Sequence, residues 1–334
     1  MTTYKDIRGT HITTVTADPP APVNGQMWYN STTRVMKGFT SNPAGTWSTT
    51  GSLNQSREGI AAAGQAPKDT GLVFAGFNNP TAYANTELFN GSSWTELNDM
   101  NTGRTTPYGF GISTAALAAG GYIGGATAAS QTFVETWNGS SWTETTDLPS
   151  GAYTGGSAGI TTSGLVFGGI TTPPFSVLSQ NTKSWNGSAW TELNDLNTAR
   201  YSLGGTGATG TAALASTGNN GSSTQTATES WNGSSWTEVN DVNTARQGVS
   251  NAGIYTDALI AAGGPSSPAL FDNTELWNGS SWTETSDMNN AVDQSDGGGS
   301  TSAAISAGGG LPSVTDQAEA WVAPTTSTVT FTAS

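Results

Sequence analysis

The sequence has no cysteine and a single histidine, His11, among its 334 residues. Disulfide bonds, thiolate nucleophiles and zinc sites built on cysteine are therefore excluded, and a metal site with histidine ligands is not expected. No stretch approaches the roughly 20 apolar residues that span a bilayer, and the first residues lack the apolar segment of a signal peptide. We therefore expect no bound metal, no cofactor and no membrane partner.

Positive charge is also scarce. Ten Lys and Arg residues stand against 24 Asp and Glu residues, which gives a formal net charge of −14. Such a field repels phosphate backbones, so nucleic acid is not an expected partner.

Small and aromatic residues are abundant instead. The chain has 44 Gly, 12 Trp and 10 Phe, a composition that disordered chains do not have. Short strands, many turns and a core of small residues with large aromatic anchors fit this composition, whereas no amphipathic helix of useful length is visible.

A repeat of 46 to 48 residues organises the chain. The phrase WNGSSWTE occurs three times and in two near copies, so that its second Trp recurs at steps of 48, 48, 46 and 46 residues. The markers of the repeat are this second Trp, an earlier Trp in the sequence E-x-W, and an Arg about ten residues after the second Trp. The second Trp is Trp94, Trp142, Trp190, Trp236 and Trp282, with Trp47 upstream; the earlier Trp is Trp137, Trp185, Trp231, Trp277 and Trp321; the Arg is Arg8, Arg57, Arg104, Arg200 and Arg246.

Counting from Arg8 gives seven units, and each is predicted to form four short strands. In the unit 152–199 these strands are 153–160, 164–169, 181–186 and 188–194. Asn-Gly predicts a two-residue hairpin between the third and fourth strands, and Gly-Gly after the second strand suits a close backbone approach.

Seven quartets of strands predict an all-β fold, a single β-propeller over 1–334 with blades at 8–56, 57–103, 104–151, 152–199, 200–245, 246–291 and 292–334. The terminal strands of this scheme are 10–17, 25–30, 34–40 and 46–51 in the first unit, and 327–334 as the fourth strand of the last. Residues 1–45 match the repeat least well, so six blades plus a separate N-terminal hairpin is the alternative.

The order of markers (Arg, Gly-Gly, E-x-W, Trp, D-[LM]-N-T-x-R) resembles the kelch motif. More narrowly, DPPAPVNGQMWYNSTTRVMKGF and WNGSSWTELNDLNTAR resemble kelch-like proteins of tailed bacteriophages from aquatic sources, and G-Q-M-W-Y-N-S-T-T resembles a module of phage virion structural proteins. The resemblance implies a virion protein of the tail, the neck or the capsid surface, where it would decorate the capsid.

Catalytic residues are not evident. His11 reads as a strand residue, and most carboxylates recur with the repeat, which places them in equivalent environments. A glycosidase needs two carboxylates in different environments, and only Asp residues outside the register could provide them. These residues are Asp69, Asp257, Asp272, Asp293, Asp296 and Asp316. Nothing in the sequence distinguishes an acid from a base among them, so we expect a protein that is not an enzyme.

The repeated Arg and Trp residues are predicted to be structural. Three of the Arg residues, Arg104, Arg200 and Arg246, follow an Asp by five residues, and an Arg at such a blade junction is expected to bind carbonyls and that carboxylate. The Trp pairs are expected to pack between blades. The alternative is that the Trp side chains form a ring on which sugars stack.

Specificity is expected on one face of the disc. Antiparallel strands place the Asn-Gly turns on one face and the unlike loops 78–86, 170–182 and 265–274 on the other. Near the tips of these loops lie Tyr83, Phe175, Leu178, Leu270 and Phe271. Loops on a rigid scaffold usually carry function. Binding through these residues and their folding over neighbouring blades are equally compatible with the sequence.

The sequence and the resemblance together predict a virion protein that binds other virion proteins, as a homo-oligomer or with different partners. A host-glycan-binding module of a tail fibre and a glycan hydrolase are the two alternatives.

Overall fold

The structure is a computed structural model that describes residues 12–23, 25–42, 45–123, 129–171, 177–265, 269–310 and 313–331. Arg8, His11 and Phe175 lie outside the described residues. The chain divides into two compact units, one of residues 1–46 with 323–334 and one of residues 47–322.

The unit 47–322 contains six four-stranded antiparallel sheets, here blades 1 to 6. Blade 1 is β5 (Ala61–Ala62), β6 (Leu72–Phe74), β9 (Thr86–Phe89) and β10 (Trp94–Glu96), and blade 2 is β11 (Tyr108–Ile112), β12 (Ala115–Ala119), β15 (Val134–Trp137) and β16 (Trp142–Glu144). Blade 3 is β17 (Gly156–Ile160), β18 (Ser163–Phe167), β19 (Thr182–Trp185) and β20 (Trp190–Leu193), and blade 4 is β21 (Gly204–Thr209), β22 (Ala212–Ser216), β23 (Thr228–Trp231) and β24 (Trp236–Val239). Blade 5 is β25 (Ser250–Ile254), β26 (Asp257–Ala261), β27 (Thr274–Trp277) and β28 (Trp282–Glu284), and blade 6 is β29 (Asp296–Ser300), β30 (Ala303–Ala307), β31 (Ala318–Val322) and β4 (Thr46–Thr49).

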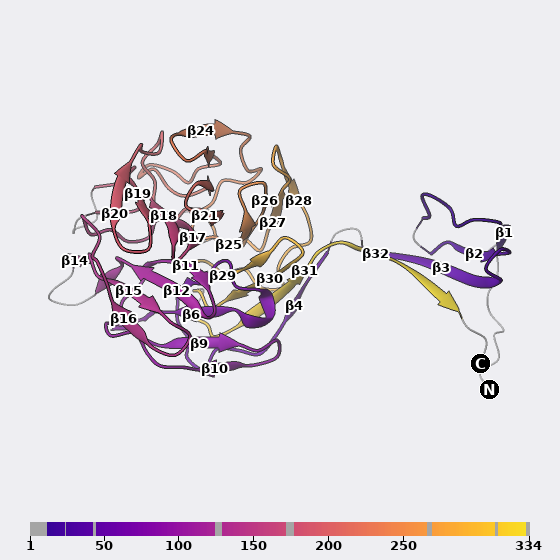
Figure 1. Ribbon diagram of the computed structural model, residues 1–334, viewed down its shortest axis with the longest axis horizontal. Coiled ribbons are helices and arrows are strands. Elements are labelled where there is room, and N and C mark those ends of the chain that lie inside the picture. The colour runs from indigo at the N-terminus through magenta and orange to yellow at the C-terminus, as the bar shows by residue number, and fades with distance from the viewer. Residues whose placement is uncertain are drawn as a thin grey trace. The chain divides into compact units, whose positions relative to one another are not determined.

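The blades form a closed ring around an axis. Their first strands contact one another in the order β5, β11, β17, β21, β25, β29 and back to β5. In Figure 1 the labelled first strands lie near the centre of the disc, and fourth strands such as β16, β20, β24 and β28 lie at its rim. Six clusters of buried apolar side chains separate successive blades, including one between blades 6 and 1. The all-β class and the propeller fold are therefore confirmed.

The number of blades differs from the preferred count of seven and matches the alternative of six. The first predicted unit, 8–56, does not form a blade. Its strand around Trp47 becomes β4, the outer strand of blade 6, while 327–334 does not serve as the fourth strand there. The reason is side-chain chemistry, because blade 6 lacks the second Trp of the repeat and β4 supplies it: the rings of Trp47 and Trp321 lie 5.6 Å apart, as in the other blades.

The other unit holds a four-stranded sheet in the order β1 (Thr13–Val15), β2 (Met27–Asn30), β3 (Val35–Asn42) and β32 (Thr325–Phe331). β1 pairs with β2 in parallel, and β32 pairs with β3 through seven antiparallel residue pairs. Asp18 organises the sheet, since it accepts hydrogen bonds from the side chains of Trp28, Asn30 and Lys37 at 2.5 to 3.0 Å. These bonds lower the pKa of Asp18 to about 2, with Lys37 as the largest cause.

Two short hairpins, β7 (Phe77–Asn78) with β8 (Thr81–Ala82) and β13 (Tyr122–Ile123) with β14 (Ala129–Ser130), extend loops of blades 1 and 2. A single turn of 3-10 helix, η1 (Lys68–Thr70), lies between β5 and β6.

Candidate functional site

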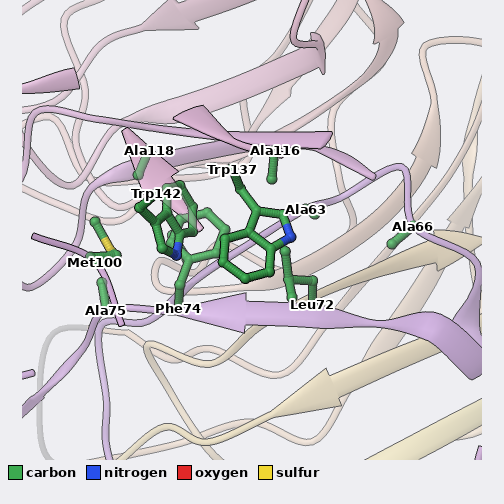
Figure 2. Close-up of a cluster of buried hydrophobic side chains, with 11 residues drawn as sticks. Ala63, Ala66, Leu72, Phe74, Ala75, Met100, Ala116, Ala118, Trp137 and Trp142 are labelled. Carbon is green, nitrogen blue, oxygen red and sulfur yellow. The ribbon is translucent and has the colours of Figure 1, made fainter. Parts of the chain in front are cut away.

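The two aromatic residues of the repeated phrase face each other across the third and fourth strands. Trp137 pairs with Trp142, and the six ring pairs of the propeller lie 5.1 to 5.6 Å apart. The second Trp also reaches the preceding blade: the ring of Trp142 lies edge-on to Phe74 of blade 1 at 4.8 Å, and Figure 2 shows both in one buried cluster. Of these twelve aromatic residues, all but the half-buried Trp190 are buried, so they pack between blades rather than forming an exposed ring for sugar stacking.

The indole N–H of the second Trp is bound by the preceding blade. Trp142, Trp236, Trp282 and Trp47 donate to the hydroxyls of Thr86, Thr182, Thr228 and Thr274, at 2.8 to 3.1 Å. Where that Thr is replaced by Val134, Trp190 donates instead to the carbonyl of Thr146. Where it is replaced by Ala318, the buried Trp94 Nε1 has no partner among the described residues.

The four repeated Arg residues that the structure describes are fully buried and form ion pairs with the Glu of E-x-W. The pairs are Arg57–Glu87, Arg104–Glu135, Arg200–Glu229 and Arg246–Glu275, with nitrogen–oxygen distances of 2.8 to 3.1 Å. Burial lowers the pKa of each Arg, and the neighbouring Glu opposes that shift. The Asp five residues before the Arg is exposed, so the predicted Asp–Arg pairing is wrong. The Glu is the partner because it lies on the buried third strand of the blade that the Arg precedes.

An Asn three residues before each Arg completes this network. In blade 4, the backbone N–H and the side-chain amide of Asn197 both donate to Glu229 Oε2 at 2.8 Å. Asn54, Asn101, Asn243 and Asn289 bind their Glu in the same way, at 2.7 to 2.9 Å. The junction segment is therefore fixed to the next blade through both oxygens of one carboxylate.

Two blades carry different versions of the network. In blade 3 the Asn, Arg and Glu are replaced together by Pro149, Ala152 and Lys183; burial lowers the pKa of Lys183, and its cross-strand neighbour Glu192 opposes that shift. In blade 6 Val292 replaces the Arg, and Asn290 donates to the second oxygen of Glu319 at 2.8 Å.

Two rings of backbone hydrogen bonds close the propeller. The second strand of every blade is followed by two residues, of which the second is always Gly, as Gly169 is in blade 3. The backbone N–H of this Gly donates to a carbonyl of the next blade, that of the repeated Arg or of the residue that replaces it, at 2.7 to 2.9 Å. The second ring is formed by the residue that lies two positions after the repeated Arg or its replacement and has a positive φ. Its backbone N–H donates to the carbonyl of the equivalent residue in the preceding blade, at 2.6 to 2.9 Å. These six residues are Gly59, Thr106, Thr154, Ser202, Gly248 and Gln294. A closed ring of this kind requires all six blades.

The Asn-Gly turns are four-residue connections, not the two-residue hairpins predicted. Trp137 and Trp142 are partners, so Asn138–Ser141 form the loop, and only Gly139 has positive φ. The side-chain oxygen of Asn138 accepts both Ser N–H groups at 2.9 Å.

The predicted loop residues that the structure describes are half-buried rather than fully exposed. Tyr83 is half-buried and its hydroxyl accepts a hydrogen bond from Gln55 Nε2 at 3.2 Å. Leu178, Leu270 and Phe271 are also half-buried, whereas Val177, beside Leu178, is 51% exposed.

A cavity of about 90 Å³ lies on the axis, lined by the first strands of all six blades. Asp296 borders it, and its carboxylate accepts hydrogen bonds from the backbone N–H groups of Gly297 (2.8 Å) and Ala62 (3.0 Å). Burial within the ring raises the pKa of Asp296 to about 7. Sites for drug-sized ligands have volumes of about 300–1,000 Å³, so this cavity suits water better than a sugar.

A pair of carboxylates, Glu58 and Asp293, lies beside Gly310, where blade 6 meets blade 1. Burial raises the pKa of both Glu58 and Asp293, and the charge of Asp293 adds to the shift of Glu58. Asp293 and Asp296 both stand outside the repeat register, and this departure is the signal by which the sequence identified them as unlike the other carboxylates. Glu58 occupies in blade 1 the position of Asp293 in blade 6 and departs from the repeat in the same way, but it was not singled out in the sequence.

A hollow of about 420 Å³ lies on the face that carries the Asn-Gly turns. It is lined by Gln65, Pro67, Lys68 and Asp69 from blade 1, Gly253, Ile254 and Asp257 from blade 5, and Gly299, Ser300 and Ala303 from blade 6. The sequence predicted specificity on the other face and did not indicate this hollow, although Asp69 and Asp257 were among the carboxylates outside the register.

Within the described residues, no helix is long and apolar enough to cross a membrane. No group of three or more His, Cys, Asp or Glu side chains is placed to hold a metal ion in the described part of the chain.

No protein-family model matches the sequence, and no curated protein matches it. Among solved structures, that of YjhT is similar, with a TM-score of 0.67 over 85% of this chain and 99% of the YjhT chain. The sequence identity is 11%, so this likeness shows the propeller fold alone.

Proposed function

We propose that the chain is a non-enzymatic structural or accessory protein of a bacteriophage virion, with the propeller as a scaffold for docking to other virion proteins or for surface recognition. The observation that carries the scaffold role is the use of the repeated charged residues. Arg200, Glu229 and Asn197, and their equivalents in three other blades, bind one another inside the fold. Buried pairs of this kind hold segments in place rather than meet a substrate.

The assignment to the virion rests on the resemblance of the repeat and of the N-terminal segment to phage proteins. The tail, the neck and the capsid surface are the proposed locations. The exposed Glu and Asp of the outer strands, such as Glu238 and Asp241, keep the surface acidic and support solubility at high local concentration.

Mass spectrometry of density-purified particles tests this proposal. The chain is expected at a fixed copy number per particle that persists through a high-salt wash. Its absence from particles produced by cells that express it would refute the virion role, and cryo-electron microscopy of the particle would identify the docking face.

A glycan hydrolase is the less supported alternative. Glu58 and Asp293 adjoin each other, but the axial cavity of about 90 Å³ does not have the volume of a sugar site. A carbohydrate-binding role is supported by the hollow of about 420 Å³ on the face that carries the Asn-Gly turns.

A further inference from the structure

The hollow of about 420 Å³ has the size of a small-molecule site and lies where the six-fold repetition is broken. In blades 2 to 6 a tight turn joins the first and second strands, as between Ile112 and Ala115 in blade 2. In blade 1 the connection runs from Ala62 to Leu72 and contains η1. This longer loop forms one wall of the hollow, so the site belongs to this position of the ring alone.

The wall is held in a fixed conformation. The backbone N–H of Gln65 donates to Gly111 O of blade 2, and its side chain donates to Gly253 O of blade 5, both at 3.0 Å. Gln65 therefore links blades that are not neighbours, and it lines both the hollow and the axial cavity. Ala66, next to it, is fully buried. A preformed site of this kind binds without first ordering a loop.

The polar groups of the hollow include both donors and acceptors. Lys68 forms an ion pair with Asp69 and keeps 19% of its side chain exposed, whereas the other five cations of the propeller are buried. Asp257 is exposed and accepts a hydrogen bond from the hydroxyl of Thr301 at 2.7 Å, and Ser300 lies beside it.

Charge and apolar surface narrow the class of ligand. One Lys and two Asp give the lining side chains a net charge of −1, which disfavours anionic ligands such as phosphates and sugar acids. Carboxylates accept hydrogen bonds in pairs, as adjacent hydroxyls of a sugar can supply them. Ile254, which is 36% exposed, and Pro67 provide apolar surface for the C–H groups of the same ring.

We propose that this hollow binds a neutral carbohydrate, as a monosaccharide or the terminal unit of a glycan. Asp257 and Asp69 accept hydroxyl hydrogens, Lys68 donates to a ring or hydroxyl oxygen, and Ile254 contacts the apolar face of the sugar. The proposal concerns the isolated protein and does not depend on its place in a virion.

Saturation-transfer NMR on the full chain tests the proposal with methyl glycosides of glucose, galactose, mannose and N-acetylglucosamine. At least one of these is expected to receive saturation, and Asp257→Ala is expected to weaken its binding at least tenfold. Position 257 corresponds to Ala115, Ala212 and Ala303 in three other blades, so the fold accepts Ala there. Ser163→Ala, at the same position of blade 3, is the matched control and is expected to bind as the wild type does.

Three results would overturn the proposal: no saturation of any of the four glycosides, equal binding by Asp257→Ala and the wild type, or binding of methylammonium in place of the sugars. Unchanged thermal melting of Asp257→Ala would show that lost binding is not lost folding. A second variant, Lys68→Gln, is expected to weaken the same sugar without affecting melting. Failure here leaves the particle assay of the proposed function unaffected.

Discussion

Replacing Arg200 with Ala tests whether the buried ion pairs hold the junction segments to the blades. Arg200 is fully buried and donates to Glu229 Oε1 at 2.8 Å and to the carbonyl oxygens of Thr217 (2.9 Å) and Ala227 (2.6 Å). The substitution leaves Glu229 buried without its cation. Breaking a buried pair in this way costs about 3–5 kcal/mol in the free energy of unfolding.

The chain contains its own rescue for this loss. Blade 3 combines Ala152 with Lys183, so Glu229→Lys in the Arg200→Ala background introduces two of the three replacements found in blade 3, with Asn197 kept where blade 3 has Pro149. Glu238 lies opposite position 229 and would face the new Lys, as Glu192 faces Lys183. We expect the double variant to regain at least half of the lost stability.

Urea unfolding followed by tryptophan fluorescence measures the free energies of unfolding of the two single variants and the double variant, with Asp99→Asn, at an exposed position of another blade junction, as a control. Glu229→Lys alone is expected to be strongly destabilising, because it places two cations together. The reasoning fails if Arg200→Ala costs less than about 1 kcal/mol, the range of exposed ion pairs. It also fails if the losses of the two single variants simply add in the double variant, because contacting residues should show a coupling energy.

Three further perturbations have defined outcomes. Gly168→Ala should cost less than Gly169→Ala, measured by thermal melting, because Ala75 and Ala262 occupy the equivalent position with a similar positive φ, although a Cβ at Gly168 would lie 2.7 Å from the carbonyl oxygen of Arg200 and requires a small shift. A Cβ at Gly169 would lie 2.5 Å from a backbone oxygen, at a position that is Gly in all six blades, and should cost more than about 2 kcal/mol. Thr182→Val removes the acceptor of a buried indole N–H and should cost about 1–3 kcal/mol in urea unfolding, with an unchanged slope of free energy against urea. Asp296 has a folded-state pKa raised from 3.8 to about 7, so the folded state holds the extra proton and the free energy of unfolding should fall as pH rises from 4 to 7. Asp296→Asn should flatten this dependence, by up to about 4 kcal/mol for a three-unit shift, and an unchanged profile would contradict the buried environment.

The strands of each blade could be predicted from the repeat, because neighbouring strands of a blade are close in sequence and their ends are marked by local signals. In the unit 152–199 the predicted strands overlap β17 to β20 closely, since glycine pairs and the Asn-Gly turn mark their ends. Closure of the ring was less visible in the sequence. Trp47 lies 274 residues before its partner Trp321, and local patterns do not show which distant strand completes a blade.

Partners across the blade were also hidden. Asp99 precedes Arg104 by five residues and is the obvious partner in the sequence, but the third strand brings Glu135 to the Arg from 31 residues away. The hollow was not predicted, because its walls come from blades 1, 5 and 6, and the repeat alone predicts the same connection between the first and second strands in every blade. Its traces were the irregular carboxylates Asp69 and Asp257.

The pairing of β3 with β32 determines how the ends of the chain respond to force. Met36 is opposite Phe331 at the end of the ladder where the chain enters and leaves, and Asn42 is opposite Thr325 at the end that continues into the propeller. Tension applied between Met36 and Phe331 would therefore open this ladder one pair at a time, beginning at that end. The strands that continue into the propeller would come under load only after all seven pairs had separated, so this ladder would yield before the ring does.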